Sequence, residues 1–317
     1  MTKKSLPYTH KNISRIAFVS GNTRTGKALT LKIIASLKDI EKGNVDFLME
    51  QATGLTITKD IKKETAIYYL RRAFSILDYN LRIGREVNFR KGDFTSVHEY
   101  QKPKKYFDNL KFKEGDGVIR AIKKEKRIIP LLIHCGLITS NIFSAFHKFV
   151  IFEMIRNPVS VIFSWINKKY DNDFNDSYRV TTLTIKYKKN ILPFYTFGWE
   201  SKYLKLNKFE RIIEMLYILE KQKEKVIKKL KKTELKKIFF IKLEDLHVKP
   251  DIVVSRIEKI LGKKRTKFTK KVLLKEKLPR IIIKNDVIKK RDLMKKNISK
   301  TYYKKLVFLE KKYNAVK

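Results

Sequence analysis

The chain has little cysteine and no long apolar run, and both facts limit its class. Its single cysteine, Cys135, excludes an intramolecular disulfide. Because Cys135 ends an apolar run, we expect a buried thiol and not a nucleophile. No uncharged apolar stretch approaches the roughly 18 residues of a membrane span, and the N-terminal residues lack the apolar core of a signal peptide. These features predict a cytoplasmic protein without a membrane span.

Acidic residues are also scarce. The chain has 32 Asp+Glu against 74 Lys+Arg, a formal net charge of +42, yet 43% of its residues are hydrophobic. That balance is typical of a globular protein attracted to polyanions such as nucleic acid, anionic lipid, acidic glycans or phosphorylated cofactors. The lysines are spread over the whole chain, so a coding bias toward Lys is an equally good explanation of the charge.

Buried-strand patterns alternate with helical ones along most of the chain. Strands are predicted at residues 15–20, 45–50, 127–135, 149–155 and 237–243, and helices at residues 28–40, 63–83, 141–147, 208–232, 250–261 and from 158 onward. This alternation predicts a three-layer α/β domain over residues 1–262, with a mainly parallel sheet covered by helices on both faces. Ligands of such sheets bind at the carboxyl ends of the strands.

The last 55 residues differ in composition. Residues 263–317 contain 21 Lys+Arg and only 4 Asp+Glu, but they keep apolar runs. We therefore expect a basic, mainly helical extension that packs on the domain and is able to contact anionic surfaces.

The first strand leads into a glycine loop. Gly21, four residues and Gly26-Lys27 form the frame of a phosphate-binding loop, but Ala28 stands where a nucleoside triphosphatase needs a Mg²⁺-binding hydroxyl. A loop between strand and helix surrounds an anion with backbone N–H groups and a positive helix end. The pattern favours a phosphate ligand that does not depend on Mg²⁺; a plain turn is the alternative.

A second segment combines an arginine with a serine. Arg156 ends a predicted strand, Asn157-Pro158 opens a helix, and Ser164 follows eight residues after Arg156. A guanidinium and a hydroxyl in this arrangement hold one phosphate. In a third segment, Glu244 and Asp245 end a strand before a helix that closes at Gly262, and we interpret them as a solvated acidic pair.

Together these segments resemble the sulfotransferase family that uses 3′-phosphoadenosine 5′-phosphosulfate (PAPS). That family binds the 5′-phosphosulfate with a loop of the form [K/R]-[S/T]-G-T-T; here Arg24, Thr25 and Gly26 match it, and Lys27 and Ala28 replace the two threonines. Its 3′-phosphate site matches the Arg156 to Ser164 segment. Its late Y-E-D-L segment matches residues 243–246, with Leu243 in the tyrosine position.

The resemblance implies PAPS as the cofactor, adenosine 3′,5′-bisphosphate (PAP) as its product, and no required metal. The implied cofactor-binding residues are Asn22, Thr23, Arg24, Thr25, Gly26, Lys27, Ala28, Arg156 and Ser164. Arg24 and Lys27 would stabilise the charge that develops on the leaving phosphate. The acceptor would present a hydroxyl or an amine, with a carbohydrate as the expected class.

Attack by the acceptor needs a general base. Many family members have a histidine about 22 residues before the strand-ending arginine, and His134 holds that position relative to Arg156. Other candidates lie in residues 84–100, which we expect to bind the acceptor: Glu86, Asp93, His98 and Glu99 as bases, and Arg85, Arg90 and Lys91 for an anionic acceptor.

Two other classes of function stay open. A P-loop kinase using Mg-ATP requires an acidic Mg²⁺ ligand near the loop, and only Asp46 and Glu50 are available in the predicted second strand. A nucleic-acid-binding protein would suit the charge, but the sequence has no helix-turn-helix, zinc-binding or RNA-binding signature.

Overall fold

A parallel sheet forms the centre of the computed structural model, which describes residues 11–170, 181–281 and 284–316. The strand order is β2-β3-β1-β4-β7, and every neighbouring pair is parallel. The strands are β1 (Arg15–Ser20), β2 (Asn44–Val45), β3 (Ile128–Leu132), β4 (Phe149–Ile155) and β7 (Ile238–Lys242). The predicted α/β fold with a parallel sheet is confirmed.

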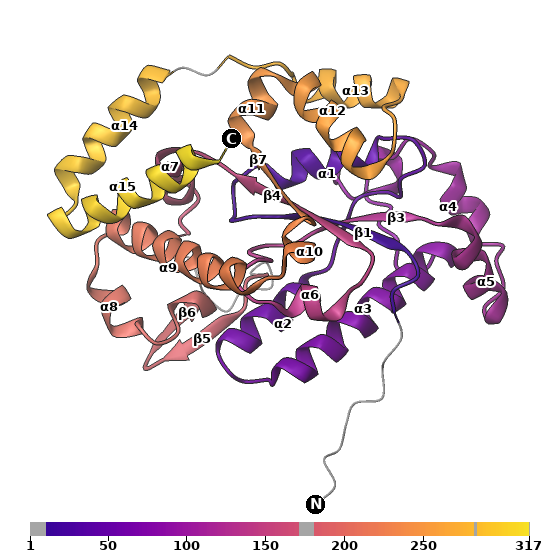
Figure 1. Cartoon of the computed structure of the whole chain (residues 1–317), viewed down its shortest axis with the longest axis horizontal. Coiled ribbons are helices and arrows are strands. Elements are labelled where there is room, and N and C mark those ends of the chain that lie inside the picture. Colours follow the sequence, from indigo (N-terminus) through magenta and orange to yellow (C-terminus); the bar gives the residue numbers. More distant parts are fainter. Residues whose placement is uncertain (1–10, 171–180, 282–283, 317) are drawn as a thin grey trace, which may run out of the picture.

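Helices cover both faces of this sheet (Figure 1). One face carries α2 (Phe47–Ile57), α3 (Lys63–Ile83) and α6 (Asn141–Ala145), and the other carries α1 (Lys27–Ala35), α12 (Pro250–Leu261) and α13 (Lys267–Lys275). Side chains of β1 alternate between the two cores: Ile16 and Phe18 face α3, whereas Ala17 and Val19 face α1. This two-sided burial explains why β1 is apolar without interruption.

The remaining helices surround these layers. They are α4 (Lys104–Asn109), α5 (Asp116–Glu125), α7 (Pro158–Asn167), α8 (Glu200–Lys205), α9 (Lys208–Lys229), α10 (Lys232–Leu235), α11 (Leu243–Val248), α14 (Lys284–Asn297) and α15 (Lys300–Ala315). A small antiparallel hairpin joins β5 (Thr184–Tyr187) to β6 (Asn190–Pro193). None of the helices within the described ranges is both long and apolar enough to cross a bilayer.

The predicted strand at residues 45–50 is wrong. The second strand ends at Val45, and α2 begins at Phe47. The cause is Asp46, whose carboxylate accepts a hydrogen bond of 3.0 Å from the backbone N–H of Met49 and so caps a helix. The short apolar run therefore belongs mostly to a helix, which brings Glu50 to the inner side of α2.

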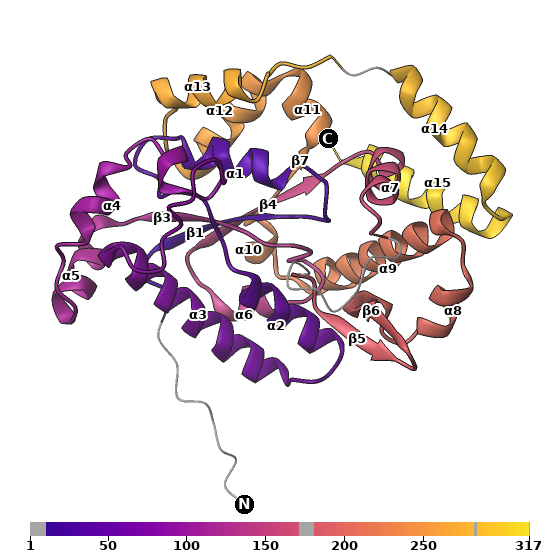
Figure 2. The same cartoon turned by 180° about the vertical axis from the view of Figure 1, so that it is seen from behind.

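The basic C-terminal residues form three helices that pack on the rest of the chain. α13 lies on α1, α14 on α7 and α15 along α9, as Figure 2 also shows from behind. Leu306 and Leu309 of α15 are buried in a third core cluster with Ile212 and Leu216 of α9. The C-terminal end of α15 thereby lies near the carboxyl end of β4, since Tyr313 and Ile155 line the same cavity.

Candidate functional site

The loop between β1 and α1 is pressed tightly against its neighbours. Gly21 has φ 133° and Gly26 has φ 92°, both in a region that favours glycine. A Cβ on Gly21 would stand 2.3 Å from the carbonyl oxygen of Met154, and one on Gly26 would stand 2.4 Å from Cδ1 of Leu243. Gly26 caps α1 without a side-chain hydrogen bond, so the first N–H groups of α1 stay available to a ligand.

Lys27 lies inside this loop. Its Nζ donates hydrogen bonds to the carbonyl oxygens of Gly21 (3.0 Å) and Asn22 (2.6 Å), and the residue is 4% exposed. Burial lowers its pKa to about 8, although the nearby Glu50 and Glu153 oppose that shift. Thr25 donates to the same Asn22 carbonyl at 2.7 Å. Both side chains thus hold the loop in shape from within.

Arg24, Arg156 and Ser164 meet on the outer side of the loop. Nε of Arg24 donates to Oγ of Ser164 at 3.0 Å, and a terminal nitrogen of Arg156 donates to the carbonyl oxygen of Arg24 at 3.1 Å. Burial lowers the pKa of Arg156, the charge of Glu244 opposes that shift, and the neighbouring Arg24 adds to it. The glycine loop and the Arg-to-Ser segment, more than 100 residues apart in the sequence, therefore form one cationic group.

Glu244 supports this group from behind. One carboxylate oxygen accepts from the backbone N–H of Asn157 at 2.9 Å, and the other accepts from the hydroxyl of Tyr313 at 2.9 Å. The side chain of Asn157 caps α7 by accepting from the N–H of Ser160. The interpretation of Glu244 as a solvated residue is wrong: it links the C-terminal helix to the start of α7.

His134 is held by a carboxylate of α2. Oε1 of Glu50 accepts from the backbone N–H of His134 at 2.9 Å and lies 2.7 Å from its Nδ1. Because a carboxylate is an acceptor, Nδ1 carries the proton of the neutral ring and Nε2 keeps its lone pair. Burial and the charge of Lys27 lower the pKa of His134, and Glu50 opposes this shift. On balance the surroundings favour the neutral form of the ring.

A cavity of about 580 Å³ joins most of these residues at the carboxyl ends of the strands. The site residues of the sequence analysis that line it are Thr23, Arg24, Gly26, Lys27, Ala28, His134 and Arg156. Phe47, Phe94 and Tyr170 supply aromatic wall. His247 and Arg280, which sequence reasoning missed, also line it, and Arg280 adds to its positive charge. Burial and the charges of Arg280 and Arg156 lower the pKa of His247 to about 4.

The other candidate bases have partners of their own and do not line this cavity. Glu86 accepts from the side chain of Asn80 at 2.7 Å, and Glu99 pairs with Lys275 at 2.6 Å. Asp93 accepts weakly from Asn88, at 3.3 Å, and the ring of His98 packs against Phe89 and Phe107. Of residues 84–100, only Phe94 lines the cavity.

The basic residues expected to bind an anionic acceptor also lie away from it. Arg85 pairs with Glu114, and Arg90 stands 4.0 Å from Asp93. Like Lys91, which is exposed, they do not line the cavity.

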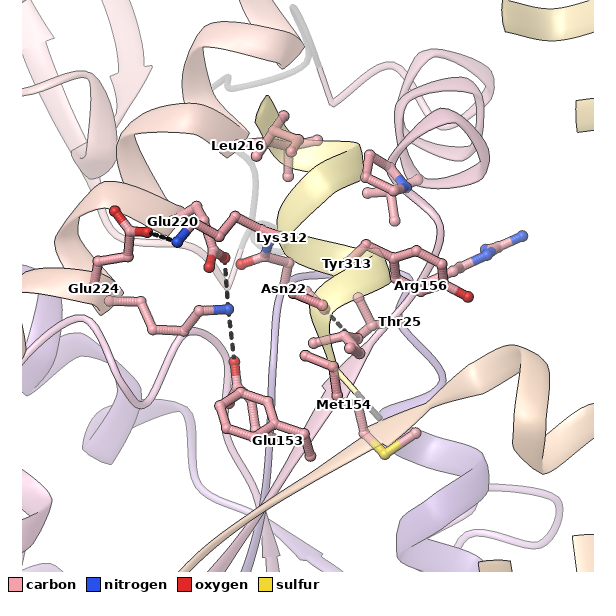
Figure 3. Close-up of a pocket in the computed structure, with 18 of the residues that line it drawn as sticks. Asn22, Thr25, Glu153, Met154, Arg156, Leu216, Glu220, Glu224, Lys312 and Tyr313 are labelled. Carbon is pink, nitrogen blue, oxygen red and sulfur yellow. Dashed lines mark hydrogen bonds and ion pairs between the residues drawn. The ribbon is translucent and has the colours of Figure 1, made fainter. Parts of the chain in front are cut away.

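A second cavity of about 370 Å³ lies on the other side of Arg156, beneath the C-terminal end of α15 (Figure 3). Asn22 and Thr25 line this cavity and not the first one. At its floor, Lys223 pairs with Glu220 at 2.6 Å and lies 3.7 Å from the buried Glu153. The guanidinium of Arg156 points away from these carboxylates in Figure 3, toward the group formed with Arg24.

The kinase hypothesis requires a carboxylate that can bind Mg²⁺, and the predicted second strand offered only Asp46 and Glu50. Both side chains already have hydrogen-bond partners. Asp46 caps α2 and Glu50 holds His134. Within the part of the chain that the structure describes, no three His, Cys, Asp or Glu side chains gather as a metal site. Burial raises the pKa of Cys135 to about 12, so its thiol stays protonated, as expected for a non-nucleophilic cysteine.

No family model matches the chain, and no curated protein matches its sequence. Several solved sulfotransferase structures resemble it. The sulfotransferase domain of the Synechococcus PCC 7002 olefin synthase has a TM-score of 0.43 and 12% identity, over 84% of this chain and 80% of that chain. The sulfotransferase domain from the curacin biosynthetic pathway has a TM-score of 0.44 and 10% identity, over 82% and 77%.

Retinol dehydratase, solved with androsterone and the inactive cofactor PAP, has a TM-score of 0.31 and 16% identity, over 81% of this chain and 62% of that chain. All of these TM-scores lie below 0.5, so the likenesses do not decide what this chain binds or catalyses. Its function follows from its own residues.

Proposed function

We propose that this chain is a PAPS-dependent sulfotransferase that moves a sulfuryl group to a hydroxyl or amine acceptor of the carbohydrate class. The observation that carries the proposal is the contact between the two phosphate segments. Arg24 of the glycine loop bonds to Ser164, and Arg156 bonds back to the loop. A ligand with two phosphate groups suits two anion-binding segments that share one cavity wall.

The residues fit a doubly phosphorylated nucleotide. The glycine loop admits close approach of an anion to the N-terminus of α1, and Arg24, Arg156 and Arg280 supply positive charge along the cavity. PAPS, when bound, would supply a sulfuryl group for transfer to the acceptor, and the phosphate from which that group is transferred would remain in the product PAP. Arg24 and the N–H groups of α1 would stabilise negative charge on that phosphate. Ala28 is acceptable because this chemistry needs no hydroxyl to hold Mg²⁺.

His134 is the proposed general base. Its Nε2 lone pair would accept the proton of the attacking hydroxyl. Glu50 would hold the ring in the correct tautomer and stabilise the imidazolium that results, since it accepts from Nδ1 at 2.7 Å. The lowered pKa of His134 keeps the ring unprotonated, and hence active, at neutral pH.

The cavity wall supports a sugar as acceptor. Phe47, Phe94 and Tyr170 provide flat aromatic surface in the same cavity as His134. A sugar ring presents one apolar C–H face that packs on aromatic rings, while its hydroxyls meet polar groups. The amine alternative would use the same base and the same wall.

Ligand-dependent thermal stability tests this proposal. PAP without added metal should raise the melting temperature more than ATP with Mg²⁺ does. A ligand that binds only the folded state stabilises it by about 2.7 kcal/mol when its concentration is one hundred times Kd. Transfer of labelled sulfuryl groups from PAPS to a panel of sugars should then identify the acceptor. A larger shift with Mg-ATP, abolished by EDTA, would support a kinase instead.

His134→Ala separates binding from chemistry in the same assays. Turnover should fall by roughly 10²–10⁴-fold, the usual contribution of a general base. The PAP-induced shift should stay close to that of the wild type, because the base contacts the acceptor and not the nucleotide. A folded variant that retains most of its activity would move the base to another residue.

A further inference from the structure

Three aliphatic side chains of residues 252–281 are unusually exposed. Ile281 is 95% exposed, Leu274 74% and Ile252 65%, the largest fractions for any large hydrophobic residue that the structure describes. They belong to α12, to α13 and to the segment that follows α13. Single exposed apolar residues are ordinary, but several in one region indicate an interaction surface.

These side chains come from segments that are joined to one another. The backbone N–H of Arg280 donates to the carbonyl oxygen of His247 at 2.7 Å. This hydrogen bond joins the segment that contains Ile281 to the end of α11, where Val248 follows His247. Val248 is itself 45% exposed. Ile252 lies in the first turn of the next helix, α12, and α11, α12 and α13 occupy the same edge of the molecule in both views (Figures 1 and 2). We call Val248, Ile252, Leu274 and Ile281 the α11–α13 surface.

The charge around this surface is mainly positive. Residues 263–281 contain nine Lys+Arg and a single acidic residue, Glu276. The carboxylate of Glu276 is already paired with Lys32 at 2.6 Å. Lys270, Lys271 and Lys277 are exposed. Asp251 and Glu258 of α12 pair with Arg265, and Glu99 pairs with Lys275. The aliphatic side chains therefore project from a background with an excess of positive charge.

We propose that the α11–α13 surface docks on an anionic lipid bilayer. Aliphatic side chains that project separately can enter the interfacial region of a bilayer, and lysines around them meet anionic headgroups. A nucleic acid would use the lysines but would leave the aliphatic side chains in water. The same region borders the large cavity, because His247, Glu276 and Arg280 line it. Docking would bring this side of the cavity close to the membrane surface, whatever reaction the cavity supports.

Vesicle flotation of the full chain tests the proposal. Wild type should bind vesicles of phosphatidylcholine with phosphatidylglycerol and should bind pure phosphatidylcholine at least tenfold less. The variant Ile252→Asp, Leu274→Asp, Ile281→Asp should lose at least tenfold of the binding to the mixed vesicles. The control is Leu235→Asp, an exposed leucine on α10, which should bind like the wild type. Because all four residues are exposed, we expect each variant to fold, which circular dichroism checks.

A spectroscopic measurement separates insertion from adsorption by net charge. Ile281→Trp should shift its emission to the blue on mixed vesicles, and Leu235→Trp should not. Equal vesicle binding by the triple Asp variant and wild type, or no shift for Ile281→Trp, would overturn the proposal in favour of charge adsorption. Stronger binding to duplex DNA than to mixed vesicles, with the same loss in the triple variant, would overturn it in favour of a nucleic-acid partner.

Discussion

Replacement of Glu50 by glutamine isolates the part that its charge plays. The amide keeps an oxygen that can accept from the backbone N–H and from Nδ1 of His134, so the tautomer is preserved. What disappears is the negative charge 2.7 Å from the ring. Hydrogen bonds to charged groups contribute about 1.5–3 kcal/mol, so turnover should fall roughly 10- to 150-fold.

The pH dependence distinguishes this role from a structural one. Burial and Lys27 lower the pKa of His134, while Glu50 raises it. Glu50→Gln should therefore lower that pKa further, and the acid limb of kcat/KM should move to lower pH. Nuclear magnetic resonance titration of the ring protons, assigned with His134→Asn, measures the pKa without any acceptor. An unchanged pKa in Glu50→Gln, with loss of thermal stability as the only effect, would refute the reasoning.

Two further predictions concern nucleotide binding. Arg156→Ala and Ser164→Ala should each weaken PAP binding by roughly 10- to 150-fold, the loss expected from about 1.5–3 kcal/mol. Calorimetry with a ligand that lacks the 3′-phosphate should show no change in affinity. Equal losses of affinity for both ligands would contradict the proposed role in binding the 3′-phosphate. Tyr313→Phe removes the bond to Glu244 and should weaken PAP binding by roughly two- to tenfold, as about 0.5–1.5 kcal/mol predicts. The control is Tyr302→Phe on the same helix, which lies in the core with α9 and should bind normally.

Local patterns predicted most of the fold. Uninterrupted apolar runs such as β1 and β4 are typical of strands buried on both faces, and glycines and prolines mark the ends of helices such as α7 and α12. The error at residues 45–50 arose where a run of a few apolar residues fits a strand and a helix equally well. Asp46 decided between them through a single capping bond, which a pattern of hydrophobicity does not record.

The site was predictable only where its residues are close in sequence. The glycine loop and the Arg156 to Ser164 segment each have a local pattern, and the structure places them in contact. Glu50 lies 84 residues from His134, and Tyr313 lies 69 residues from Glu244. Neither spacing has a signature, because one contact depends on how α2 packs on the sheet and the other on how α15 packs along α9.

Gly26→Ala tests whether the loop must approach its neighbours as closely as the structure indicates. Gly26 has φ 92°, and its new Cβ would meet Leu243 Cδ1 at 2.4 Å. Gly198 has a similar φ of 86° but no atom within 4 Å of its Cβ position. Gly198→Ala therefore measures the backbone cost alone, about 1–2 kcal/mol. Gly26→Ala should cost more than that, because Leu243 has to move.

The two variants should also differ in PAP binding. Gly26 and Leu243 both line the large cavity, so displacement of Leu243 or of the loop changes its wall. Gly26→Ala should therefore weaken PAP binding, and Gly198→Ala should not. Chemical denaturation gives the stability of each variant, and calorimetry gives the affinity. Equal losses of stability in Gly26→Ala and Gly198→Ala would mean that Leu243 moves without a measurable cost in free energy. Unchanged PAP affinity in Gly26→Ala would mean that the nucleotide does not approach the loop at this glycine, and the proposed position of the 5′-phosphosulfate would be wrong.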